Sequence, residues 1–157
     1  MRNVELRGKT ILVTGVAGFI GSNLVKRIYE MVEDVTVVGI DNLNEYYDVS
    51  LKEHRLTELD KYSTFTFIRG NIADNQLIIS LFQQYKPQIV VNLAAQAGVR
   101  YSITNPAVYI ESNIVGYFNI LEACRHSYDN GERGVEHLVY ASSSSVYGSN
   151  TKVPYST

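Results

Sequence analysis

Residues 11–21 read ILVTGVAGFIG, and this stretch decides the fold class of the chain. Apolar residues lead into three glycines spaced by threes: Gly15, Gly18 and Gly21. Further apolar residues follow at helical spacing, at positions 20, 24, 25, 28, 31 and 32. The pattern predicts a buried strand, a glycine turn and an amphipathic helix in direct succession. Such a unit forms a cradle for a phosphate group, because bare backbone and free N–H groups face the ligand.

The spacing GxxGxxG is one residue longer than the standard dinucleotide fingerprint, so a plain packing turn is the alternative interpretation. Two observations favour ligand binding. The glycines follow a predicted strand and open a predicted helix, and Asp41 lies 20 residues after Gly21, at the end of the apolar run VTVVGID. A carboxylate at that place can accept hydrogen bonds from an adenosine ribose. We therefore predict a dinucleotide-binding turn.

The composition is that of one globular domain: 157 residues, 45% hydrophobic and 19% charged, with a net charge of −2. The charge favours neither nucleic acid nor an anionic membrane surface, and the chain has no membrane-length apolar run. We expect no nucleic-acid or membrane partner. The single cysteine, Cys124, excludes an internal disulfide and fits a reducing compartment, so we expect a cytoplasmic protein. The three histidines lack metal-ligand spacing, and we expect no metal site.

Apolar runs alternate with helical patterns along the chain. Strands are predicted at 10–14, 35–40, 63–68, 88–93 and 136–141, helices at 18–31, 51–59, 73–85 and 106–126, and irregular structure at 95–105 and 142–157. This alternation predicts a parallel sheet with helices on both faces, a Rossmann-type doubly wound α/β fold. The glycine turn favours strand order 3-2-1-4-5, with the ligand at the carboxyl ends of the strands. The Thr/Phe alternation at 64–67 predicts that the third strand lies at an edge.

The residues that follow each strand should then form the site. No basic residue closely follows Asp41 and Asn42, which favours NAD over NADP as the cofactor. Asn71 and Ile72, after the third strand, can offer an amide and an apolar wall to adenine. The small residues at 94–98 would let the cofactor lie close to the chain, although tight packing of the loop on a helix is the alternative.

Two further features have two interpretations each. Arg100 could clamp a phosphate or carboxylate, or could be a solvated charge. The four serines at 142–145 could include a hydroxyl that hydrogen-bonds a substrate alcohol during hydride transfer, or could simply form a polar loop.

The segments TGVAGFIG, DNLN, NLAAQAGVRYS, SNIVGYFNILEA and YASSSSVYG resemble the extended short-chain dehydrogenase/reductases that act as NAD-dependent nucleotide-sugar epimerases and dehydratases. DNLNEYYDVSLKEHRL and NLAAQAGVRYSI are most similar to the UDP-glucuronate 4-epimerases of that family. The resemblance implies catalytic roles for Ser143 and Ser144, and a substrate-binding role for Arg100. Its implied cofactor-binding residues are Gly15, Ala17, Gly18, Phe19, Ile20, Gly21, Asp41, Asn42, Asn71, Ile72, Leu93, Ala94, Ala95, Gln96 and Asn113.

The activity implied by this resemblance is 4-epimerisation of UDP-glucuronate to UDP-galacturonate by transient oxidation at C4. A tyrosinate takes the hydroxyl proton while the hydride passes to NAD and later returns to the other face. Related dehydratases and decarboxylases carry acidic residues between the serine and VYG. Ser144 and Ser145 occupy those positions here, which favours simple epimerisation.

The family's Tyr-x-x-x-Lys pair has no counterpart, because no tyrosine in this chain has lysine four residues later. We therefore expect an N-terminal fragment without epimerase activity of its own. It would comprise a Rossmann domain over 1–148, incomplete at its C-terminal edge, and a loop over 149–157, without the substrate domain. The alternatives are a non-catalytic NAD-binding module or another nucleotide-sugar epimerase or dehydratase. An unpaired edge at 136–141 and the long helix at 106–126 lead us to expect self-association as a dimer.

Overall fold

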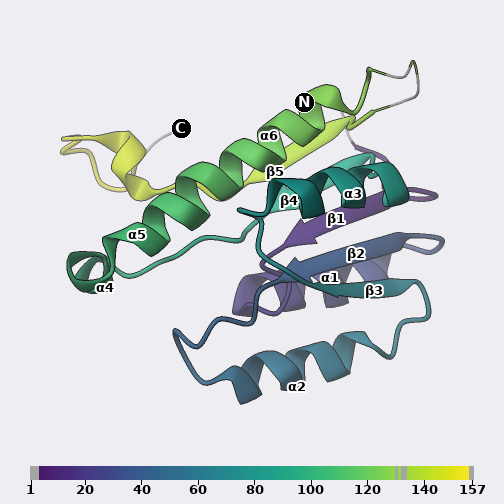
Figure 1. Cartoon of the computed structure of the whole chain (residues 1–157), viewed down its shortest axis with the longest axis horizontal. Coiled ribbons are helices and arrows are strands. Elements are labelled where there is room, and N and C mark those ends of the chain that lie inside the picture. The colour runs from purple at the N-terminus through teal and green to yellow at the C-terminus, as the bar shows by residue number, and fades with distance from the viewer. Residues whose placement is uncertain (1–3, 130, 132–133, 156–157) are drawn as a thin grey trace.

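The computed structural model describes residues 4–129, 131 and 134–155. Five parallel strands form one sheet in the order β3-β2-β1-β4-β5 (Figure 1). The strands are β1 (Thr10–Thr14), β2 (Thr36–Asp41), β3 (Phe65–Arg69), β4 (Ile89–Asn92) and β5 (His137–Tyr140). This confirms the predicted Rossmann-type α/β fold, the strand order and the edge position of the third strand. β5 lies at the other edge of the described sheet.

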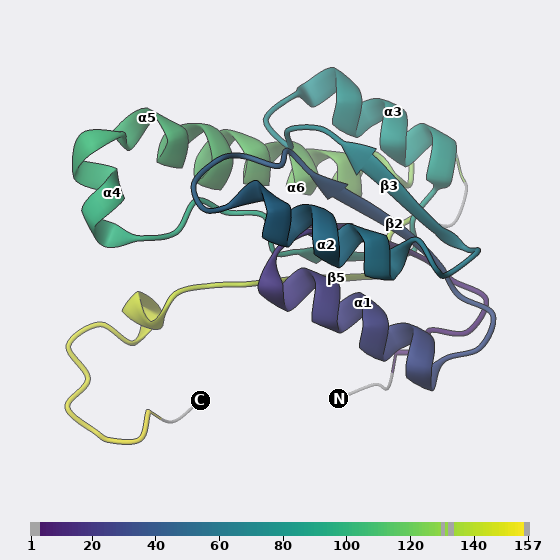
Figure 2. The same cartoon turned by 90° about the horizontal axis from the view of Figure 1, so that it is seen from below.

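Helices cover both faces of the sheet (Figures 1 and 2). One face carries α1 (Phe19–Met31) and α2 (Val49–Leu59), and the other carries α3 (Asn75–Tyr85) and α6 (Tyr117–His126). The predicted long helix at 106–126 is continuous: α5 (Pro106–Tyr109) leads into a π-helical segment, η1 (Ile110–Gly116), and then into α6. A short 3₁₀ helix, η2 (Ser144–Tyr147), follows β5.

Alternate residues of the central strands supply two separate cores. Ile11 and Val13 of β1 pack in a cluster with Val25 of α1, whereas Leu12 packs with Ile78 of α3 and Ile120 of α6. Each of the central strands is therefore buried on both faces. This is why β1, β2 and β4 appear in the sequence as continuous apolar runs rather than as polar–apolar alternation. Cys124 is half-buried against the second cluster, where burial raises the pKa of its thiol to about 11.

The prediction of irregular structure over 95–105 is wrong in part, because the helix α4 (Val99–Thr104) forms there. None of the residues of α4 is buried, so the segment lacks the apolar periodicity that predicts a helix. Local polar contacts support it instead: the hydroxyl of Ser102 donates to the carbonyl of Val99, and Thr104 donates to that of Tyr101. The helix ends at Thr104, ahead of Asn105 and Pro106.

The turn between β1 and α1 depends on close backbone contacts. Gly15 has a positive φ of 69°, and a Cβ there would lie 2.9 Å from the amide nitrogen of Ala94. A Cβ on Gly21 would lie 2.4 Å from the carbonyl oxygen of Gly15 and 2.9 Å from the Cα of Val16. Since these neighbours are backbone atoms, they cannot move aside without moving the turn. Both glycines are therefore required by packing as well as by any ligand.

We predict that Gly21→Ala destabilises the fold by about 1–3 kcal/mol, the usual range for overpacking of a tight site. The added methyl group would force the first turn of α1 away from Gly15. Urea unfolding followed by circular dichroism measures the change.

Asn23→Ala is the matched control, because Asn23 is exposed on the same helix, and its unfolding midpoint should change little. Equal stability of Gly21→Ala and the wild type would show that the turn can relax around a side chain.

Candidate functional site

A pocket of about 420 Å³ lies at the carboxyl ends of β1, β2 and β4, where a doubly wound sheet binds ligands. The glycine turn, the loop after β2 and the loop after β4 form its walls. Most of the predicted cofactor residues line it: Gly15, Gly18, Phe19, Ile20, Gly21, Asp41, Asn42, Asn71, Ile72, Leu93, Ala94, Ala95 and Gln96. Its size is within the range of small-molecule sites in proteins.

Asp41 is buried at the end of β2 and connects two walls of the pocket. Its Oδ2 accepts a hydrogen bond from the Ala17 N–H at 3.2 Å, and its Oδ1 accepts one from the Leu43 N–H at 2.9 Å. Leu43 has a φ of 53°, in the left-handed region that a leucine rarely adopts. Ala17 does not line the pocket, but its N–H helps to orient the carboxylate.

Thr14 holds the loop after β4 against the glycine turn. Its hydroxyl donates to Asn92 Oδ1 at 2.7 Å and accepts from the N–H groups of Leu93 and Ala94 at 3.1 and 3.0 Å. Both Thr14 and Asn92 are buried. Sequence analysis missed this pair, although the signal was present: each is a polar residue at the carboxyl end of a buried apolar strand.

Asn113 lies outside the pocket and fixes one of its walls. From the π-helical segment η1, its Oδ1 accepts from the Gln96 N–H at 2.8 Å and its Nδ2 donates to the Gln96 carbonyl at 3.0 Å. The amide thus satisfies both backbone groups of one pocket residue. Single turns of π-helix often occur at functional sites, and here one carries the residue that holds the loop after β4.

Asn71 and Ile72 form the wall beyond β3. The Asn71 Nδ2 donates to Glu111 Oε1 at 2.7 Å, and its Oδ1 accepts from the Ala73 N–H at 3.0 Å. Both ends of the amide therefore have protein partners. Ile72 is buried beneath the long helix, where a Cβ on Gly116 would lie 2.5 Å from it.

Two cations that sequence analysis missed lie in the pocket beside Asp41. Lys52 is only 4% exposed, and its Nζ is 3.8 Å from Asp41 Oδ1. The same ammonium donates to the carbonyl and to Oδ1 of Asn44, at 3.0 and 2.8 Å. Burial lowers the pKa of Lys52, and Asp41 opposes that effect.

Arg55 also lines the pocket, where its Nη1 donates to the Ala17 carbonyl at 3.2 Å and to the Tyr47 hydroxyl at 3.0 Å. The surroundings of Asp41 therefore carry positive charge, although no basic residue closely follows it in the sequence. Helix α2 folds back over the end of β2 and brings these cations from further along the chain.

The three residues predicted to act in catalysis or substrate binding also lie outside the pocket. Arg100 is exposed on α4, and Ser143 and Ser144 are exposed after β5. Ser143 caps η2 by accepting a hydrogen bond from the Ser145 N–H at 3.2 Å. The segment that contains these serines extends away from the sheet (Figure 2). Ala141, at the end of β5, does line the pocket, so the chain leaves the site just before the serines.

Within the part of the chain that the structure describes, no three or more His, Cys, Asp or Glu side chains form a group that could hold a metal ion. Among the same residues, no helix combines the length and apolar character needed to cross a membrane.

Comparisons with known proteins agree with this geometry. Protein CapI of Staphylococcus aureus is 51% identical over 147 residues, which are 94% of this chain and 41% of that protein. UDP-glucuronate 4-epimerase 3 of Arabidopsis thaliana is 45% identical over 150 residues, 96% of this chain and 33% of that protein. Among solved structures, a UDP-glucuronic acid 4-epimerase from Bacillus cereus in complex with UDP-glucuronic acid and NAD matches with a TM-score of 0.77. It is 34% identical, and the match covers 91% of this chain and 43% of that one.

The chain thus spans less than half the length of these relatives. The family model described as GDP-mannose 4,6 dehydratase matches residues 12–157, which include every element of the fold except the first two residues of β1. The chain belongs to the GDP-mannose 4,6 dehydratase family.

Proposed function

We propose that this chain is the NAD-binding part of a nucleotide-sugar 4-epimerase that interconverts UDP-glucuronate and UDP-galacturonate. The observation that carries the proposal is the pocket in which the glycine turn, the buried Asp41 carboxylate and the small-residue loop after β4 meet. The relatives support it, because they include UDP-glucuronate 4-epimerases and a related enzyme whose structure contains NAD. A non-catalytic NAD-binding module and another nucleotide-sugar epimerase or dehydratase are the alternatives.

The residues of the pocket suit the parts of a dinucleotide. Helix α1 begins after Gly18, and Gly18 has no side chain to cap the helix. The backbone N–H groups at the N-terminus of α1 can therefore donate to a pyrophosphate. The Asp41 carboxylate can accept hydrogen bonds from the adenosine ribose, since each oxygen has more than one lone pair. Asn71 and Ile72 would face adenine. Ala94 and Ala95 are small enough for the rest of the cofactor to lie against the loop after β4.

The chemistry needs groups beyond this pocket. NAD, when bound, supplies the hydride acceptor for transient oxidation at C4 of the sugar. Ser143 and Ser144 would hydrogen-bond the sugar hydroxyl, and Arg100 would bind the substrate, once these segments approach the pocket. Because the chain has no Tyr-x-x-x-Lys sequence to take the hydroxyl proton, we propose that it binds NAD but does not epimerise by itself.

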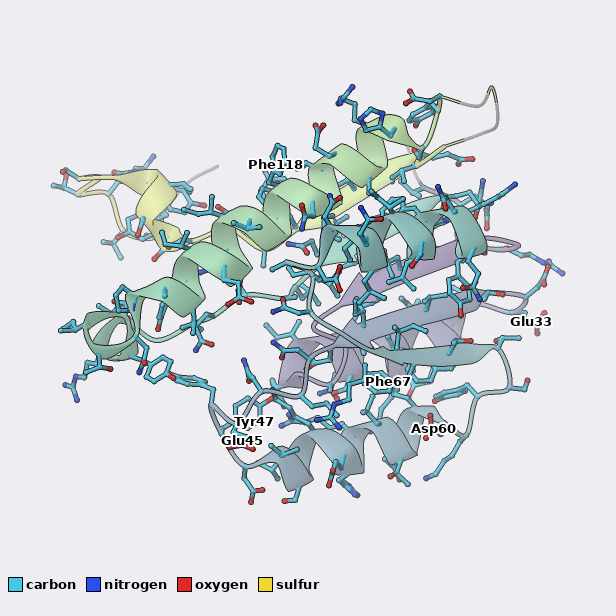
Figure 3. All side chains as sticks on the ribbon, viewed as in Figure 1. Glu33, Glu45, Tyr47, Asp60, Phe67 and Phe118 are labelled. Atoms are coloured by element: carbon cyan, nitrogen blue, oxygen red, sulfur yellow. The ribbon has the colours of Figure 1, made fainter. Side chains whose placement is uncertain are left out.

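The long helix offers a surface for self-association. Ile110, Ile114, Phe118 and Leu121 form an exposed apolar stripe along it, and Phe118 projects from the outer side of the helix (Figure 3). The edge strand β5 adds exposed Val139 and Tyr140. Apolar stripes and free strand edges are typical of interfaces, so we propose a homodimer.

We predict that Ala95→Phe weakens NAD binding to the 157-residue chain by about tenfold or more. Ala95 lines the pocket and is itself exposed, so a phenyl ring would occupy ligand space without disturbing the core. Isothermal titration calorimetry with NAD gives the dissociation constants.

The matched control is Ala107→Phe, which places the same ring on exposed α5 outside the pocket and should leave NAD affinity unchanged. If Ala95→Phe binds NAD as tightly as the wild type, the cofactor does not lie in this pocket.

A second prediction concerns activity. The 157-residue chain, incubated with UDP-glucuronate and NAD, should form no UDP-galacturonate, because it lacks the base that must take the proton of the C4 hydroxyl. Anion-exchange chromatography of the nucleotide sugars detects conversion. Turnover at the rate of a full-length UDP-glucuronate 4-epimerase would overturn the proposal that this base is required.

A third prediction concerns assembly. The wild-type chain should be dimeric by light scattering, and Phe118→Glu should shift it toward the monomer, since the variant places a charge in the apolar stripe. Thr57→Glu, which adds the same charge to an exposed position of α2, should remain dimeric. A monomeric wild type would contradict the proposed interface.

A further inference from the structure

The pocket lining carries more positive than negative charge. A site that excludes a phosphate group on the adenosine ribose is expected to have the opposite balance. Its charged residues are Asp41, Lys52 and Arg55, one anion and two cations. All three lie at the end formed by the loop after β2 and helix α2. Glu45 lies on the same loop (Figure 3) and lines an adjoining hollow rather than this pocket.

Arg55 and Asp41 both hydrogen-bond to the backbone of Ala17. The guanidinium donates to the carbonyl of Ala17, and the Asp41 carboxylate accepts from the N–H of the same residue. The two side chains therefore flank one residue of the glycine turn. The Tyr47 ring supports both cations, with Lys52 Nζ 4.9 Å and Arg55 Cζ 5.8 Å from its centroid.

Lys52 lies near the carboxylate oxygen that does not accept from Ala17. Two of the three ammonium donors are satisfied by Asn44, and the nitrogen lies 3.8 Å from Asp41 Oδ1. One donor can therefore serve an acceptor located where the carboxylate now lies. Asn44 in turn donates to Gln96 Oε1 at 3.5 Å, so the lysine belongs to the polar network that joins the two loops of the pocket.

The two nicotinamide dinucleotides differ only by a phosphate on the 2′-oxygen of the adenosine ribose, the group that a carboxylate after the second strand excludes. We infer that Lys52 and Arg55 form a latent 2′-phosphate site, and that the Asp41 carboxylate alone masks it. The inference rests on the proposed NAD-binding function and adds the origin of its cofactor specificity. A guanidinium with an adjacent ammonium is well suited to a phosphate dianion.

The test measures the dissociation constants of NAD and NADP for the wild type, Asp41→Asn and Asp41→Asn/Arg55→Met. Asp41→Asn should shift the NADP-to-NAD affinity ratio toward NADP by about 10- to 100-fold, as expected for gaining charge-assisted hydrogen bonds in place of repulsion. The added Arg55→Met substitution should remove most of that gain. Thermal melting verifies that each variant is folded.

Arg55→Met in the wild-type background tests the same inference if Asp41→Asn does not fold. It should weaken NADP binding several-fold more than NAD binding, whereas Arg27→Met, at an exposed position of α1, should change neither. The inference is overturned by an unchanged NADP-to-NAD affinity ratio in folded Asp41→Asn, or by equal losses of affinity for both dinucleotides in Arg55→Met. In either case, NAD binding by the wild type leaves the proposed function intact. A wild-type chain that binds neither dinucleotide overturns both.

Discussion

The close approach of three backbone segments at the carboxyl end of β1 is the constraint on which the rest of the site depends. Gly21 packs on the carbonyl of Gly15, and Gly15 packs on the backbone of Ala94. Side chains at the two glycines would separate β1 from α1 and from the loop after β4. The hydroxyl of Thr14 completes the junction by bonding the N–H groups of Leu93 and Ala94. Backbone N–H groups can face a phosphate here because Gly15, Gly18 and Gly21 carry no side chains.

Polar contacts extend this junction into the two loops that define the pocket. Asp41 bonds the glycine turn on one side and the loop after β2 on the other, and Lys52 anchors that loop through Asn44. Gln96 on the loop after β4 is held by Asn113 of the long helix. Side chains from α2 and from the π-helical segment, both outside the sheet, therefore fix the positions of residues that follow its strands.

Much of the fold could be predicted because burial on both faces makes β1, β2 and β4 continuous apolar runs, while the glycine turn determines which strand is central. The walls of the pocket followed from the rule that ligands bind at the carboxyl ends of the strands. What could not be predicted depends on tertiary placement. Lys52 and Arg55 do not directly follow Asp41 in the sequence and reach the pocket only because α2 folds back over it. Helix α4 buries no face and so leaves no periodic pattern. Arg100, Ser143 and Ser144 lie on segments outside the pocket. Their predicted contacts with a substrate therefore depend on where those segments are placed, which the sequence pattern does not determine.

The central position of β1 has a consequence for synthesis of the chain on the ribosome. β1 pairs with β2, which follows soon after, but its other neighbour is β4, and the Thr14 contacts with residues 92–94 span 78 to 80 positions. A nascent chain must therefore expose one edge of this apolar strand until β4 has emerged. The glycine turn is made early, whereas the wall opposite it is made late. Ligand binding can thus stabilise the finished domain but cannot assist the first steps of its folding.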